Sequence, residues 1–192
     1  MSDGSLGSSL AIQVADLVRA ARDYVQRATG CSVDLSVESL AYMDHYLRTV
    51  RQAGPISDEL RALLAAALGA HLGEVAIARF GGRWRESAPH EHNQVDDRDP
   101  AGWQVELDCV PLWFAPVGMA AEALASGEVD GYDGSLRTRP DLLGPLQEAL
   151  ERTAPVTEEY YYSLTGRFET VAFAVELLAE LERQRRERAG CA

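Results

Sequence analysis

The segment that most constrains the fold is residues 60–84, LRALLAAALGAHLGEVAIARFGGRW, because it combines a long apolar pattern with small residues at helical spacing. Ser57 stands before it as a helix-capping residue, and a Gly-Gly pair supplies a stop. Alanine and glycine recur every three or four residues, so one stripe of the predicted helix lacks bulk. An interior glycine costs roughly 1 kcal/mol relative to alanine, so Gly69 and Gly73 indicate close packing against a neighbour. That neighbour is a helix or a ligand, and we favour a helix.

The length of 192 residues suits one domain with a substantial core. We expect a flexible Gly/Ser-rich N-terminus at residues 1–8 and a single domain over residues 9–192. The net charge of −12 argues against a nucleic-acid surface or an anionic membrane, since binding phosphate requires clustered cations.

The chain contains no lysine, because all 18 basic residues are arginine. This excludes Schiff-base chemistry, pyridoxal phosphate anchored on lysine, the P-loop and Ser-x-x-Lys hydrolases. Cys31, Cys109 and Cys191 are widely spaced, which favours reduced thiols. No signal peptide or apolar run of about 20 residues is found, so we expect a bacterial cytoplasmic protein.

Apolar periodicity predicts several helices besides the central one. They cover about residues 10–29, residues 36–53, residues 117–125, residues 141–153, and a long C-terminal helix from Thr157 that Gly166 bends. Residues 126–138 are expected to form a Gly/Asp loop.

Three short extended segments predict a small antiparallel sheet covered by helices. They are residues 83–87, residues 103–109 and residues 112–114. In the second, Trp103 and Cys109 belong to the apolar face, and Gln104 to a solvent-exposed face. The third stands between Pro111 and Pro116, which predicts an edge strand or strand end. The expected fold class is therefore α+β, predominantly helical.

A metal site is one possible source of chemistry. His71 and Glu74 lie three residues apart on the central helix and share a face, but a third ligand has to come from His90 and His92 or from the Asp44–His45 pair. The alternative is a histidine and a glutamate that only form hydrogen bonds.

Two acidic segments partly resemble metal-binding loops. Residues 97–108 match a calcium loop at four positions, but Pro100 and the strand that follows do not fit one. The segment EVDGYDG, residues 128–134, is typical of turns. We therefore expect no metal and no cofactor.

Aromatic residues supply the remaining candidates. Trp84, Trp103 and Trp113 either line a ligand pocket or anchor the core between helices and sheet. A tyrosine-rich segment forms an exposed recognition patch or covers the sheet, since tyrosine and arginine are favoured in interface centres. The candidate interaction residues are Tyr160, Tyr161, Tyr162, Arg167 and Glu169.

The run LGAHLGEV, followed by GGRW, an alternating strand and PVGMA, resembles uncharacterised bacterial domain-of-unknown-function families with an LGxxLGE helix and a GGxW turn. The likeness covers Leu60 to Leu124. It implies an α+β fold in a bacterial cytoplasm and carries no activity over.

We expect a non-catalytic interaction or accessory module of adaptor, immunity or regulatory type, because no catalytic motif is present. The partner is a protein of unknown identity, with no nucleic acid and no membrane, and a homo-oligomer is possible. The alternatives are a small metal-dependent enzyme built on His71 and Glu74, and a small-molecule binding protein with a tryptophan-lined pocket.

Overall fold

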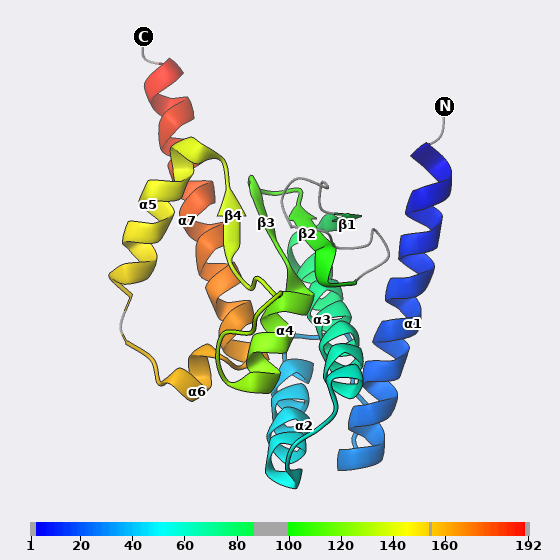
Figure 1. Cartoon of the computed structure of the whole chain (residues 1–192). Helices are drawn as coiled ribbons and strands as arrows, with labels where there is room; N and C mark the ends of the chain where they lie inside the picture. The colour runs from blue at the N-terminus through cyan, green and yellow to red at the C-terminus, as the bar shows by residue number, and fades with distance from the viewer. Residues whose placement is uncertain (1–2, 87–99, 154, 191–192) are drawn as a thin grey trace.

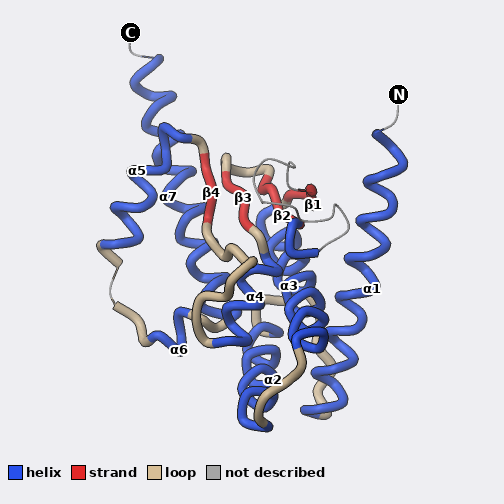
Figure 2. Tube along the Cα trace, viewed as in Figure 1, coloured by secondary structure: helices blue, strands red, loops and turns tan. Residues whose placement is uncertain are grey.

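The computed structural model describes residues 3–86, 100–153 and 155–190 (Figure 1). The long helices are Asp3–Thr29 (α1), Ser39–Ala53 (α2), Asp58–Phe80 (α3), Pro116–Ala125 (α4), Pro140–Glu151 (α5) and Leu164–Gly190 (α7). A single turn, Glu158–Tyr161 (α6), precedes α7, and a short 3-10 helix, Pro100–Gly102 (η1), precedes the second strand. The strands are Gly82–Glu86 (β1), Trp103–Leu107 (β2), Leu112–Phe114 (β3) and Leu136–Thr138 (β4). The predicted α+β class with a mostly helical chain is confirmed (Figure 2).

The central helix α3 forms as its sequence predicts. The Ser57 hydroxyl accepts a hydrogen bond from the Leu60 amide at 3.2 Å, and Gly81 ends the helix with a positive φ of 72°. A Cβ atom built on Gly69 would lie 2.5 Å from the Cα atom of Val117, so the backbones of α3 and α4 approach each other at this glycine. At Gly73 the neighbour is the indole ring of Trp84. The expectation of close packing against a helix is therefore confirmed at the first glycine, and an aromatic ring fills the second gap.

The sheet has four strands, one more than predicted, in the order β1-β2-β3-β4 with every pair antiparallel. The segment predicted as a Gly/Asp loop contains β4, in which Arg137 pairs with Trp113. Because β3 pairs on both sides, it is an internal strand, and the edge assignment drawn from its flanking prolines is wrong. Pro111 and Pro116 lie just outside the ladder, so neither removes one of its hydrogen bonds.

The C-terminal helix is interrupted near its start. The prediction of one helix from Thr157 is wrong, because α6 ends at Tyr161 and α7 begins at Leu164. Asp44 of α2 caps the new start: its carboxylate accepts hydrogen bonds from the Leu164 amide at 2.7 Å and from the Thr165 amide and hydroxyl at 3.1 and 2.6 Å. A carboxylate at a helix N-terminus satisfies free amides and interacts favourably with the helix dipole.

The helices form two flanks around a central pair. α3 and α4 pack against each other beneath the sheet, α1 covers α3 on one side, and α5 and α7 lie together on the opposite side (Figure 1). The sheet lies at the same end of the molecule as both termini. Every residue from Pro116 to Leu124 in α4 is buried, so this short helix is the most enclosed element.

Three further sequence expectations are corrected. The first helix begins at Asp3 and not near residue 10 as predicted, since extending an established helix costs little. Cys109 is exposed, because β2 ends at Leu107 and the side-chain alternation stops there. Gln104 is buried, although its position in the strand predicts exposure to solvent.

α3 is long and apolar enough to cross a membrane by length and composition, with a mean hydropathy of 1.5, so the expectation that the chain has no apolar run of about 20 residues is wrong. Within the fold, 67% of this apolar window is buried. α3 packs against α1 and α4, and its apolar composition is therefore that of a core helix.

Candidate functional site

The strongest departure from an apolar core is a buried ion pair between α4 and α7. Arg167 donates a hydrogen bond from its guanidinium to the Glu122 carboxylate, and the two side chains are only 6% and 10% exposed. The same carboxylate accepts a hydrogen bond from the Gly134 amide at 3.1 Å. A buried charge must be compensated, so these three groups hold α4, α7 and the loop before β4 in one arrangement.

Two tyrosine rings cover the guanidinium. The Arg167 Cζ atom lies 4.3 Å from the ring centroid of Tyr161 and 5.1 Å from that of Tyr162, and the two rings meet edge to face at 5.0 Å. Cation–π contact stabilises a guanidinium that has lost its water. The expected exposure of Arg167 is therefore wrong, because the pairing with Glu122 draws it beneath the tyrosines.

Tyr160 and Tyr161 remain on the surface, with 37% and 43% of their area exposed, and Glu169 is exposed beside them. A hydrogen bond from the Tyr160 hydroxyl to Glu169 raises the pKa of that tyrosine to about 12. Four of the five predicted interaction residues, Tyr160, Tyr161, Tyr162 and Glu169, thus lie on or beside one surface. The fifth, Arg167, is buried beneath the rings of Tyr161 and Tyr162.

The loop before β4 packs closely on α4. A Cβ atom on Gly118 would overlap the Asp133 backbone, so this position requires glycine, and one on Gly134 would displace the Glu122 carboxylate. Burial opposes the charged form of Asp133, but hydrogen bonds from Ser135 and Arg137 outweigh it and hold the pKa of this carboxyl at about 2. The loop is therefore a fixed wall of the site.

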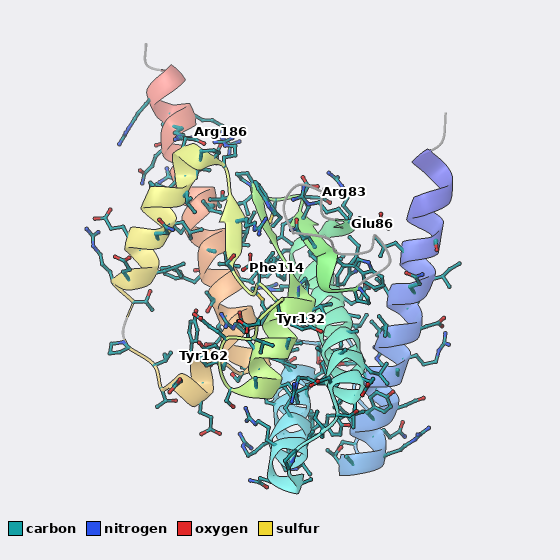
Figure 3. All side chains as sticks on the ribbon, viewed as in Figure 1. Arg83, Glu86, Phe114, Tyr132, Tyr162 and Arg186 are labelled. Atoms are coloured by element: carbon teal, nitrogen blue, oxygen red, sulfur yellow. The ribbon has the colours of Figure 1, made fainter. Side chains whose placement is uncertain are left out.

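Three cavities have Tyr161 in their lining. A polar one of about 420 Å³ is bounded by the loop before β4 and is lined by Glu128, Asp130, Tyr132 and Tyr162, among others. Figure 3 labels Tyr132 and Tyr162 of this lining. An apolar one of about 670 Å³ lies beside α6 and α7 and is lined by Val156 and Phe173, among others. A smaller one of about 220 Å³ lies between α5 and α7 and joins the other two through shared lining residues.

Exposed apolar side chains concentrate at these cavities. Of the nine large apolar side chains that are exposed in the described part of the chain, five line the two cavities between α5, α6 and α7. They are Leu143, Val156, Tyr160, Tyr161 and Phe173, which we call the Tyr161 groove. Contiguous exposed apolar surface marks a site of interaction more often than isolated residues do.

The predicted metal candidates do not converge in the described part of the chain. His71 is fully buried, and its Nε2 atom lies 2.9 Å from the Ser39 hydroxyl, which itself donates to the Ser36 carbonyl. Glu74 accepts a hydrogen bond from the Trp84 indole at 2.7 Å. No group of three possible metal ligands occurs among the described residues, and His90 and His92 lie outside them.

The buried histidine has a strongly shifted ionisation. Burial, with the nearby positive charge of Arg22, lowers the pKa of His71 to about 4, and Asp34 opposes this shift. The imidazole is therefore neutral at pH 7. Because the Ser39 hydroxyl donates to the Ser36 carbonyl, the tautomer that satisfies both groups carries its proton on Nε2, and in that tautomer the nitrogen facing the hydroxyl does not act as its base.

The tryptophans do not form one pocket. Trp84 and Trp103 make an edge-to-face pair with ring centroids 6.4 Å apart on the helix-covered face of the sheet. Trp113 pairs in register with Glu106, so it lies on the opposite face, where the Arg85 guanidinium sits 5.2 Å from its ring centroid. The core-anchor alternative therefore fits Trp84 and Trp103.

Sequence reasoning missed Glu122, although a signal was present. It is the only charged residue in the apolar helix PVGMAAEALA, and a lone carboxylate among core residues indicates a buried partner. The two exposed carboxylates Glu128 and Asp130 were interpreted only as parts of turns, because nothing in the sequence indicates that their loop borders a cavity.

Comparison of the chain with protein-family models, curated proteins and solved structures gives no match. The resemblance to bacterial domains of unknown function therefore stays a prediction.

Proposed function

We propose that the protein is a non-catalytic protein-binding module and that the Tyr161 groove is its binding surface. The observation that carries this proposal is the concentration of exposed apolar side chains around one hollow, on a surface fixed by the buried Glu122–Arg167 pair. Tyrosine is favoured at interface centres because it presents a large amphipathic ring with little conformational entropy to lose.

The arrangement supports binding better than chemistry. The one buried serine–histidine contact in the described chain has the histidine as donor, and Glu122 and Arg167 neutralise each other. A rigid apolar hollow with a polar margin is the form of an interface that takes a side chain from a partner.

The test is site-specific photo-crosslinking in the cells that produce the protein. A photoreactive phenylalanine analogue replaces Phe173 in the groove or, as the matched control, Ile12 on α1, which is exposed to 61%. We expect a discrete protein adduct from position 173 and none of the same mass from position 12. Equal adducts from the two positions, or none from position 173, would contradict the proposal.

A further inference from the structure

The polar and apolar cavities beside Tyr161 form a two-part recognition surface. Both are lined by Tyr161 and Tyr162, so a single bound segment that crosses these rings reaches both. The apolar part, with Val156 and Phe173, accepts a large hydrophobic side chain. The polar part is lined by charged side chains, and their charge decides which group of a partner it can bind.

Carboxylates outnumber cations at the margin of this surface. Glu128 and Asp130 line the polar cavity, and Glu158 and Glu169 line the apolar one. Within the described part of the chain, Glu128, Asp130 and Glu158 form no ion pair, and Glu169 is bonded only to the Tyr160 hydroxyl. The one cation among the described residues that line these two cavities is Arg167, which Glu122 already neutralises. Arg51 and Arg61 share a separate, neighbouring cavity with Glu128 and Asp130, but neither forms an ion pair with these two carboxylates within the described residues.

Tyrosine rings add to the attraction for a cation. Tyr132, Tyr161 and Tyr162 line the polar cavity together with the two free carboxylates. A ring face attracts an ammonium or guanidinium group, and the attraction increases when water is excluded. A partner with acidic side chains would be repelled here and by the net charge of −12.

We infer that the Tyr161 groove, together with the adjoining polar cavity, binds an amphipathic segment of a partner protein that presents one large apolar side chain and a neighbouring arginine or lysine. This inference rests on the proposed binding function and names the chemistry of the partner. The apolar side chain enters the cavity beside α6 and α7, and the cation lies against the tyrosine rings between Glu128 and Asp130.

A second copy of the chain is a less suitable occupant. Its cationic segment is the end of α7, where Arg183 is held by Glu180 and Glu187, and Arg185 by Asp141. Arg186 and Arg188 of the same segment form no ion pair within the described residues, but the net charge of −12 on each copy opposes the approach of a second copy. A separate basic partner matches the surface better.

The test is selection from a phage-displayed library of random peptides of about 16 residues, which is four to five helical turns. The library is selected on the wild-type protein and depleted on a Val156→Ser, Phe173→Ser double variant. Enriched peptides are synthesised with a fluorescent label, and their Kd values are measured by anisotropy at low and high salt. Circular dichroism confirms that each variant is folded.

Three variants resolve the contributions. The Val156→Ser, Phe173→Ser variant removes apolar lining, and a Glu128→Gln, Asp130→Asn variant removes charge without changing shape. Ile12→Ser, on the distant helix α1, is the matched control for removing exposed apolar area. For peptides that join an apolar residue to a basic one, we expect the charge variant to weaken binding about five- to tenfold, the effect of losing two partly exposed ion pairs.

The other outcomes separate the two proposals. Peptides that require Val156 and Phe173 but are neutral or acidic would overturn the basic-segment inference and leave the binding function standing. Peptides unaffected by both groove variants, or an absence of enrichment, would contradict both. Dimerisation of the protein that Phe173→Ser abolishes would assign the groove to a second copy and also overturn the inference.

Discussion

The buried histidine predicts a measurable loss of stability in mild acid. In the unfolded chain His71 has the ordinary pKa of 6.5, and in the folded protein its pKa is lowered to about 4. Between these values the unfolded state binds a proton that the folded state does not, so stability rises with pH and falls as the solution becomes more acidic. The window of lost stability therefore runs from pH 6.5 down to about pH 4.

The magnitude follows from the same two values. Each pH unit within the window costs about 1.36 kcal/mol, so at about pH 5 the His71 contribution amounts to about 2 kcal/mol. At about pH 7.5 the histidine is neutral in both states, and its contribution is close to zero. A loss of this size is a substantial fraction of the total stability of a small domain.

The assay is urea denaturation of the wild type and of His71→Gln over this pH range. Glutamine retains an N–H donor for Ser39 but does not titrate, so the difference between the two pH profiles isolates the histidine. His45→Gln is the control, because His45 is exposed on α2. We expect the wild type to lose about 2 kcal/mol more than His71→Gln between about pH 7.5 and about pH 5, and His45→Gln to follow the wild type.

A parallel pH dependence in the wild type and His71→Gln would refute the reasoning. So would a histidine resonance assigned to residue 71 by NMR that titrates near its ordinary pKa. Either result would mean that the imidazole reaches water in the native state.

Three further predictions concern packing and buried charge, each measured as a change in the free energy of unfolding. Gly73→Ala should destabilise the protein by about 1–3 kcal/mol, because the added Cβ atom overlaps the indole ring of Trp84. Gly144→Ala in α5 should stabilise it by up to about 1 kcal/mol, because no atom lies within 4 Å of the added Cβ atom. Equal effects of the two substitutions would contradict the close approach at Gly73. Asp44→Ala should cost about 1–3 kcal/mol by releasing the first turn of α7, and an unchanged stability would mean that water replaces the cap. Glu122→Ala should cost about 3–5 kcal/mol because it leaves the Arg167 guanidinium buried without its counterion, and a cost below about 1 kcal/mol would show that the arginine escapes to solvent.

Local patterns predicted the helices well. The capping serine, the glycine stop and the small-residue stripe of α3 depend on neighbours within a few residues, and the structure confirms each of them. The break between α6 and α7 was missed because its cause is distant: Asp44 supplies the cap from another helix. Apolar periodicity continues across the break and conceals it.

The sheet shows the same distinction. β2 and β3 have recognisable alternation or β-rich composition, but β4 is three residues in a polar segment and is defined only by its pairing with β3. Gln104 is buried for a related reason, since the Arg85 side chain, from the neighbouring strand, bonds its amide oxygen at 3.0 and 2.6 Å. The alternation of residues within one strand does not reveal which side chains of the neighbouring strand will contact it.

The candidate site was only partly predictable. The tyrosine run and Arg167 are visible in the sequence, and composition indicates an acidic surface without lysine. Their roles depend on Glu122, 45 residues earlier in the chain, which takes the arginine inward and leaves Tyr160 and Tyr161 outside.

The sequence by itself determined the helical framework, the small-residue contact face of α3 and the negative charge, because these depend on residue type and local spacing. Only the tertiary structure decided which charges became buried, which strands paired and where exposed apolar residues gathered. Those outcomes require contacts between residues far apart in the chain. An unpaired buried charge or backbone amide costs free energy, so the fold in which these groups are paired is favoured.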